Sequence, residues 1–204
     1  MQDQNYLKAV SGLCPSLREP LAAVPDLLAQ SAQEIRLGAG KPLYLHDGRR
    51  PFFLDRRGGC HDSPQEARIV TREEVMESFR SLCQYSVHTH LDEMQNGYIT
   101  TQGGHRAGIA GTAVYQQSGL FTVRDISAIC LRIARMIPGS AEELVQQCCR
   151  DRVSGILLAG EPGSGKTTLL RDLILQLCSG REGRFVKAVA VDEKNEISSC
   201  LEGN

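Results

Sequence analysis

The chain has 204 residues, of which 41% are hydrophobic and 23% are charged, which are proportions typical of globular proteins. They exclude a fibrous repeat and a wholly disordered chain, and the length allows one or two domains. Lys and Arg number 23 against 24 Asp and Glu, a formal net charge of −1, so direct binding of nucleic acid through bulk positive charge is not expected.

The first residues contain neither a basic cluster nor an apolar stretch, so they do not resemble a signal peptide. No apolar run approaches the roughly 20 residues of a membrane-spanning helix. The eight cysteines include no Cys-x-x-Cys pair, and we interpret them as reduced, mostly buried residues of a cytoplasmic protein. A less favoured hypothesis is that Cys148 and Cys149 form a redox pair or bind a soft metal. His88 and His90 could ligate a metal, but the sequence offers no further ligands beside them.

The N-terminal part of the chain predicts short elements. Apolar residues at helical spacing occupy 15–33, but Pro20 and Pro25 predict short or kinked helices there. Thr71 and Glu74 form a capping-box pattern that predicts the start of a further helix. Before this helix, three strands are expected at 34–37, 42–45 and 51–54, and an exposed polar loop is expected at 56–64.

β-Structure is expected again between 98 and 137. Residues 98–115 predict a hairpin with its turn at 102–105, in which Gly108 and Gly111 mark bulges or close backbone approach. Short strands, or one strand and a turn, are expected over 121–137. Ser140 and Glu143 form a second capping-box pattern and predict a helix, after which we place a domain boundary near Arg150.

Residues 160–167 read Gly-Glu-Pro-Gly-Ser-Gly-Lys-Thr and fit the phosphate-loop pattern G-x-x-x-x-G-K-[ST]. An apolar strand is expected before the loop at 155–159. The helix expected after it ends near Ser179, with an apolar face and a polar face, the latter carrying Arg171, Asp172 and Gln176. This strand–loop–helix context favours a phosphate site over the alternative, a glycine turn that binds nothing.

The residue types in this loop suit a triphosphate. Glycines let backbone N–H groups converge on phosphate oxygens, and the helix start adds partial positive charge. We expect Lys166 to bridge the outer phosphates and the Thr167 hydroxyl to bind Mg²⁺. The predicted ATP-binding residues are Gly160, Glu161, Pro162, Gly163, Ser164, Gly165, Lys166, Thr167 and Thr168.

A second acidic site is predicted after an apolar strand at 186–191. Asp192 and the glutamates behind it would face the same crevice as the phosphate loop if the two strands were parallel neighbours. Glu193 or Glu196 is then expected to polarise the attacking water, with Asp192 holding the loop or Mg²⁺. A Walker B strand and a solvated acidic loop are the alternatives.

Ordered blocks along nearly the whole chain resemble one known family. They are Glu34-Ile35-Arg36-Leu37, Lys41-Pro42-Leu43, Gly97-Tyr98-Ile99-Thr100, Gly103-Gly104-His105-Arg106-x-Gly108-x-x-Gly111, Leu131-Arg132-Ile133-Ala134-Arg135, Pro162 to Asp172, and Asp192-Glu193-x-x-Glu196-Ile197. In this order they resemble the stage III sporulation protein AA family of spore-forming bacteria. The glycine-histidine-arginine block and the extended phosphate loop are the most specific of these matches.

The resemblance implies an ATPase similar to the motors of type II and type IV secretion and pilus systems. Such motors are usually homo-oligomeric, often hexameric, and this one would lie in the mother-cell cytoplasm, peripheral to the membrane through membrane-embedded sporulation channel proteins. Glu196 would occupy the position of the water-activating glutamate. The candidates for arginines that reach the nucleotide from the N-terminal domain are Arg106, Arg132 and Arg135.

We therefore expect an α/β chain with an N-terminal α+β domain of antiparallel strands and helices at 1–150. The first part of a RecA-like P-loop NTPase core would follow at 151–204. The chain departs from the family with Lys194-Asn195 in place of Arg-Ser, and it ends before the later Walker B strand. We expect ATP and Mg²⁺ to bind but hydrolysis by this chain alone to be weak or absent. The alternatives are a non-catalytic assembly module and, less favoured, a small nucleotide kinase.

Overall fold

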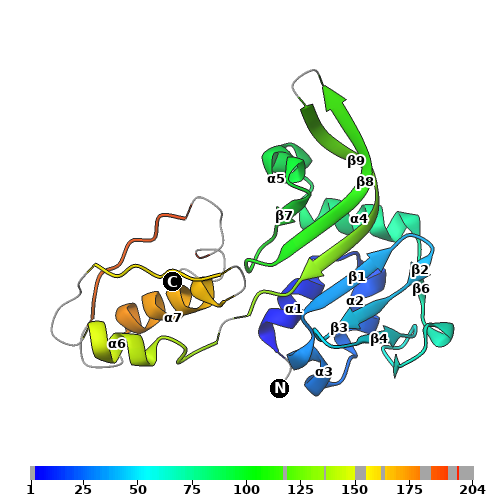
Figure 1. The fold of residues 1–204 in the computed structure, drawn as a ribbon. Helices are drawn as coiled ribbons and strands as arrows, with labels where there is room; N and C mark the ends of the chain where they lie inside the picture. Colours follow the sequence, from blue (N-terminus) through cyan, green and yellow to red (C-terminus); the bar gives the residue numbers. More distant parts are fainter. Residues whose placement is uncertain are drawn as a thin grey trace. The chain divides into compact units, whose positions relative to one another are not determined.

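The computed structural model describes residues 3–116, 119–135, 137–149, 155–161, 164–179, 185–192 and 197. The chain divides into two compact units, Met1–Ala134 and Arg135–Asn204 (Figure 1). The division comes before the helix at 142–148 rather than after it, because that helix packs against the helix that follows the phosphate loop.

A seven-stranded sheet in the order β5-β4-β3-β1-β9-β8-β7 forms the first unit, and every neighbouring pair in it is antiparallel. Its strands are β1 (Glu34–Gly38), β3 (Tyr44–His46), β4 (Pro51–Leu54), β5 (Cys60–His61), β7 (Tyr98–Thr100), β8 (Arg106–Gln116) and β9 (Gly119–Arg132). A separate short pair joins β2 (Lys41–Pro42) to β6 (Ile69–Val70). The expected antiparallel α+β architecture is thus confirmed for this unit.

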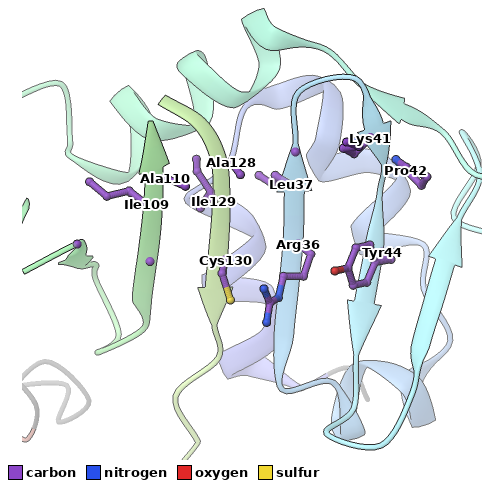
Figure 2. Close-up of a pocket in the computed structure, with 13 residues that line it drawn as sticks. Arg36, Leu37, Lys41, Pro42, Tyr44, Ile109, Ala110, Ala128, Ile129 and Cys130 are labelled. Atoms are coloured by element: carbon purple, nitrogen blue, oxygen red, sulfur yellow. The ribbon is translucent and has the colours of Figure 1, made fainter. Parts of the chain in front are cut away.

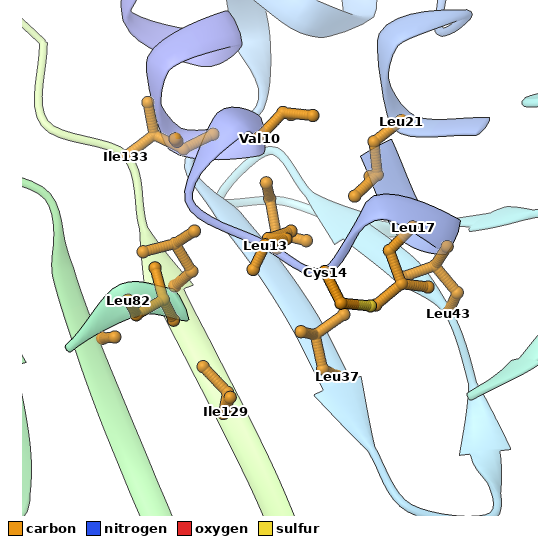
Figure 3. Packing of buried hydrophobic residues seen from close by; sticks show 14 of the residues in the cluster. Val10, Leu13, Cys14, Leu17, Leu21, Leu37, Leu43, Leu82, Ile129 and Ile133 are labelled. Atoms are coloured by element: carbon orange, nitrogen blue, oxygen red, sulfur yellow. The ribbon is translucent and has the colours of Figure 1, made fainter. Parts of the chain in front are cut away.

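Helices pack against one face of this sheet. They are α1 (Gln4–Ser11), α2 (Pro15–Ala22), α3 (Asp26–Ser31), α4 (Arg72–Leu82) and α5 (Leu91–Gln95), with the 3-10 turns η1 (Pro64–Glu66) and η2 (Val87–His90). Leu13 and Leu17, around the start of α2, are fully buried and pack with Leu37 of β1 (Figure 3). Because side chains alternate along a strand, Glu34 and Arg36 of β1 lie on the opposite face, which remains open.

Most short-range predictions in this unit are confirmed. Pro20 lies inside α2 and Pro25 directly precedes α3, so the region forms two short helices. β7 and β8 form the expected hairpin, and Gly111 lies at a register shift between β8 and β9. One expectation is wrong: the loop at 56–64 contains β5, which pairs with β4. Of the two alternatives for 121–137, the structure has one strand, the 14-residue β9, rather than several short ones.

The capping box at the start of α4 is formed as predicted. Thr71 Oγ1 accepts the Glu74 N–H at 3.2 Å, and Glu74 Oε2 accepts the Thr71 N–H at 3.0 Å. We expect Thr71→Ala to lower the free energy of unfolding of the first unit by about 1 kcal/mol, because one N–H at the helix start loses its acceptor. Chemical denaturation followed through the amide protons of α4 measures this. Thr89→Ala, which removes an exposed hydroxyl outside any helix cap, should change stability less.

His61 of β5 lies between two carboxylates. Its Nε2 is 3.1 Å from Asp55 Oδ2, and its Nδ1 is 2.9 Å from Glu66 Oε2. The hydrogen bond that His61 donates to the Asp55 carboxylate, together with the charge of Glu66, raises the pKa of His61 above its ordinary value. Since the folded pKa exceeds the unfolded value near 6.5, the stabilisation is complete below that pH and is lost as pH rises through the folded pKa.

The charge state of His61 should therefore depend on Asp55. In Asp55→Asn we expect the pKa of His61 to fall back toward 6.5, because the carboxylate that favours the imidazolium is gone. An NMR titration of the His61 ring measures the shift. Asp62→Asn is the matched control, since Asp62 pairs with Arg50 instead. Equal His61 titration midpoints in the two variants would contradict this assignment.

The second unit contains α6 (Glu142–Cys148) and α7 (Lys166–Ser179), which lie side by side in Figure 1 and share a small core around Val145 and Leu173. α7 confirms the predicted helix. The strands expected at 155–159 and 186–191 are wrong, since residues 155–161 and 185–192 carry no strand in the structure. A strand needs a hydrogen-bonded neighbour, and in these two described segments Leu157 and Val189 are each 91% exposed.

The start of α6 also departs from the prediction. The capping residue is Ala141, whose side chain makes no cap, so the Ser140–Glu143 capping box does not form. Instead the carboxylate of Asp172 in α7 accepts the Gly139 N–H at 3.1 Å and the Ala141 N–H at 2.8 Å. Asp172 and Arg171, which belong to the predicted polar face of α7, are both buried.

Candidate nucleotide-binding site

The phosphate loop curves around the side chain of Lys166. Its ammonium donates to Gly160 O at 2.9 Å, to Glu161 O at 2.6 Å and to Ser164 Oγ at 3.4 Å. Gly165 has φ +88°, a conformation that suits glycine, and its carbonyl accepts the Leu169 N–H at the first turn of α7. The structure therefore brings together four of the predicted site residues: Gly160, Glu161, Ser164 and Lys166.

This geometry provides a positive charge at a helix N-terminus. The first N–H groups of α7 have no acceptor within the helix, and the helix dipole adds partial positive charge there. A Cβ atom at Gly160 would lie 2.8 Å from Ser164 Oγ, so that hydroxyl would have to rotate away. Thr167 and Thr168 belong to the first turn of α7 and are half-buried. An anion is the ligand that such a site favours.

The predicted acidic site is described only in part. Asp192 Oδ2 accepts the Ile197 N–H at 2.6 Å. Glu193 and Glu196, and also Pro162 and Gly163 of the phosphate loop, lie outside the described residues.

Two of the three candidate arginines face each other across strands of the first unit. Arg106 of β8 is the cross-strand partner of Arg132 of β9. The Arg106 guanidinium lies 4.4 Å from the centre of the Tyr98 ring, and Arg132 Nη2 lies 3.6 Å from Glu34 Oε1. The Arg132 side chain is 68% exposed, so it can be recruited by an anion. Arg135 is the first residue of the second unit.

Glu34 is the acidic residue beside these arginines. Burial alone would raise the pKa of Glu34, but hydrogen bonds and charge from Arg36, aided by Arg132, lower it below its ordinary value. The Glu34 Oε2 to Arg36 Nη2 distance is 2.6 Å. Glu34 therefore stays ionised at neutral pH and leaves this part of the open sheet face with a net positive charge.

Sequence reasoning did not predict a hollow of about 410 Å³ on the open face of the sheet (Figure 2). Its floor consists of small residues from three adjacent strands, namely Gly38, Gly108, Ala110 and Ala128. Arg36, its cross-strand partner Cys130, and Tyr44 also line it. The alternation of small residues along β8 is the signal that could have located it.

Two further expectations concern metal and membrane. His90, one of the two histidines considered as metal ligands, instead pairs with Glu93, at 2.8 Å from Nδ1 to Oε2. Cys148 and Cys149, both among the described residues, form no disulfide. Among the helices of the described ranges, none combines the length and the apolar character needed to cross a bilayer.

Comparison with known proteins assigns the family. The profile described as "Sporulation stage III, protein AA" matches residues 10–204. The chain belongs to the sporulation stage III protein AA family. Stage III sporulation protein AA of Bacillus subtilis (strain 168) is 33% identical over 189 residues, which cover 92% of this chain and 58% of that protein. The resemblance inferred from the sequence blocks is thereby confirmed.

Other similarities cover less of the proteins concerned. Protein SEEDLING PLASTID DEVELOPMENT 1 of Arabidopsis thaliana is 37% identical over 76 residues, or 36% of this chain and 10% of that protein. The X-ray structures of the ATPase DotB from Legionella pneumophila and Yersinia pseudotuberculosis are 18% and 24% identical, with TM-scores of 0.44 and 0.38. Each covers 74% of this chain, and the match spans 39% and 40% of the DotB chains. These scores are too low to establish a shared fold.

The extent of the family match has a consequence for function. The chain spans 58% of the length of the Bacillus subtilis relative. For this chain, the activity of a full-length family member is therefore a proposal.

Proposed function

We propose that this chain of the sporulation stage III protein AA family binds Mg-ATP at the loop formed by residues 160–167. The observation that carries the proposal is the bend of this loop around the Lys166 ammonium at the start of α7. A fixed positive charge, a helix N-terminus and glycines in the loop are together suited to a triphosphate. Membership of the family supports the same reading.

In this proposal the residues divide the work. Lys166 neutralises charge on the outer phosphates, while the Thr167 hydroxyl and Asp192 would hold Mg²⁺. Bound Mg²⁺ would supply charge neutralisation at the phosphate oxygens. Glu193 or Glu196 would orient and deprotonate the attacking water.

The role in the cell follows from the resemblance to secretion and pilus motors. We propose that a homo-oligomer of the family protein, in the manner of a hexameric ring, acts on the mother-cell side of the membrane. It would be peripheral to the membrane and would transmit the energy of ATP hydrolysis to membrane-embedded sporulation channel proteins. A RecA-like core around the phosphate loop belongs to this proposal.

A second candidate function is a catalytically weak assembly module. The segments 155–161 and 185–192, which form no strand, favour it, because a parallel sheet is the usual support of a phosphate loop. In this case the first unit would mediate contacts with other proteins and nucleotide would have little effect on them.

Sedimentation with and without Mg-ATP separates the two functions. The motor proposal expects saturable Mg-ATP binding and oligomers that form or change size when the nucleotide is present. The assembly module expects association that is the same in both conditions. Absence of any saturable binding in an equilibrium titration would refute the proposed nucleotide site.

A further inference from the structure

The hollow on the open face of the seven-stranded sheet is separate from the proposed nucleotide site, because every residue that lines it belongs to the first unit. Its volume of about 410 Å³ lies within the range of small-molecule sites, which is about 300–1,000 Å³. The helices of this unit pack on the other face of the sheet, so they do not cover the hollow (Figure 1). Its lining residues therefore decide which kind of molecule it can take.

The floor of the hollow is flat and apolar. Gly38, Ala128 and Ala110 are cross-strand partners on β1, β9 and β8, so one row of small residues crosses three strands. With about 4.8 Å between neighbouring strands, this row is about 10 Å long. The main-chain N–H and C=O groups of β9 bond to the strands on both sides, so they are not available to a ligand. Such a floor accommodates the face of a planar apolar group.

An aromatic ring lies at the rim of the hollow. Tyr44 of β3 is the cross-strand partner of Arg36 and lines the hollow (Figure 2). Its ring centre is 5.5 Å from that of Phe53 on β4, so a second ring supports it. Aromatic side chains contribute a large apolar contact area to a binding site. The rim thus favours a ring-shaped ligand as the floor does.

The charge around the hollow is positive. Arg36 and Lys41 line it, and none of the residues that the structure places in its lining is acidic. Arg36 Nε and Nη2 donate to Glu34 Oε2 at 2.9 and 2.6 Å, whereas Nη1 takes no part in this pair, and the side chain is 43% exposed. Lys41 reaches over the floor, because a Cβ atom at Gly38 would lie 3.1 Å from Lys41 Cγ. Charge complementarity favours an anion.

We propose that this hollow binds a small molecule with a flat, mainly apolar body and one anionic group. The body would lie on the row of small residues, and the anionic group would contact Arg36 and Lys41. The inference goes beyond the proposed function, because it uses no residue of the phosphate loop and stands or falls without nucleotide binding.

Two fluorescent probes of the same shape test the proposal with the full, folded chain. Anilinonaphthalene sulfonate has a planar apolar body and one anionic group, and phenylnaphthylamine has a similar body without the charge. We expect saturable binding of the anionic probe to one site. In NMR spectra, the amide signals of Gly38, Gly108 and Ala128 should shift when this probe is added.

The variants separate the charge of the hollow from its shape. Arg36→Gln should weaken binding of the anionic probe by about tenfold and change binding of the neutral probe by less than about twofold. Arg72→Gln is the matched control, since Arg72 also pairs with a carboxylate, that of Asp125, but does not line the hollow. We expect it to leave the affinity for both probes close to that of the wild type.

Filling the hollow should weaken both probes by about tenfold or more. Gly108→Leu can do this without a clash in the main chain, because a Cβ atom at Gly108 would approach no atom closer than 3.8 Å. Ala110→Leu fills the neighbouring row and serves as a second, independent variant. The proposal is refuted if both filling variants, still folded by NMR, bind the anionic probe as the wild type does. It is equally refuted if the wild-type chain self-associates and Gly108→Leu abolishes the association, since a second copy would then occupy the hollow.

Discussion

Replacing Lys166 by alanine should weaken Mg-ATP binding by about 10- to 100-fold. The ammonium supplies charge-assisted hydrogen bonds to phosphate, and such bonds contribute more than neutral ones. Without the ammonium, the Gly160 and Glu161 carbonyls that now bind it would face the phosphates and repel them. Equilibrium titration of the purified chain with Mg-ATP measures the change.

Lys187→Ala is the matched control for this prediction. Lys187 lies in the same unit and is exposed, so its removal changes the net charge equally without touching the loop. We expect its Mg-ATP affinity to stay close to that of the wild type. Unchanged affinity in Lys166→Ala would show that the loop does not bind phosphate, even if the chain bound nucleotide elsewhere.

Features determined by neighbouring residues could be predicted from the sequence. The α4 cap needs only Thr71 and Glu74, three positions apart, and both of its hydrogen bonds are present. The β7–β8 hairpin follows from a turn whose Gly103 and Gly104 adopt positive φ. The phosphate loop likewise depends on one continuous segment, and its contacts around Lys166 are formed within it.

Features determined by distant residues could not be predicted in this way. The runs at 155–159 and 186–191 are apolar enough for strands, but a strand also depends on which segment lies beside it. The contact between His105 and Ala134 spans 29 positions, so no local sequence pattern predicts it. The cap of α6 is a further case, because Asp172 lies 31 positions after Ala141 and replaces a local pattern that looked sufficient.

Asp172→Ala should therefore be the most destabilising single change in the second unit. The carboxylate is 4% exposed and accepts three hydrogen bonds, from Gly139 N, from Ala141 N and, at 2.6 Å, from Gln176 Nε2. Removing it leaves two backbone N–H groups at the start of α6 without their acceptor. At about 1–3 kcal/mol for each of the two unsatisfied groups, we expect a loss of about 2–6 kcal/mol.

Denaturation followed through the amide protons of α6 and α7 measures this loss. Glu143→Ala removes an exposed carboxylate from α6 and should change the stability by less than about 0.5 kcal/mol. Asp172→Asn distinguishes the loss of hydrogen bonds from the loss of side-chain packing, because asparagine has nearly the same size as aspartate. Its single amide oxygen can accept a hydrogen bond from one backbone N–H, whereas its NH₂ group is a donor and cannot accept one from the other. The stability of Asp172→Asn should lie between those of the wild type and Asp172→Ala. If Asp172→Ala proved as stable as Glu143→Ala, packing between α6 and α7 rather than this carboxylate would hold the start of α6.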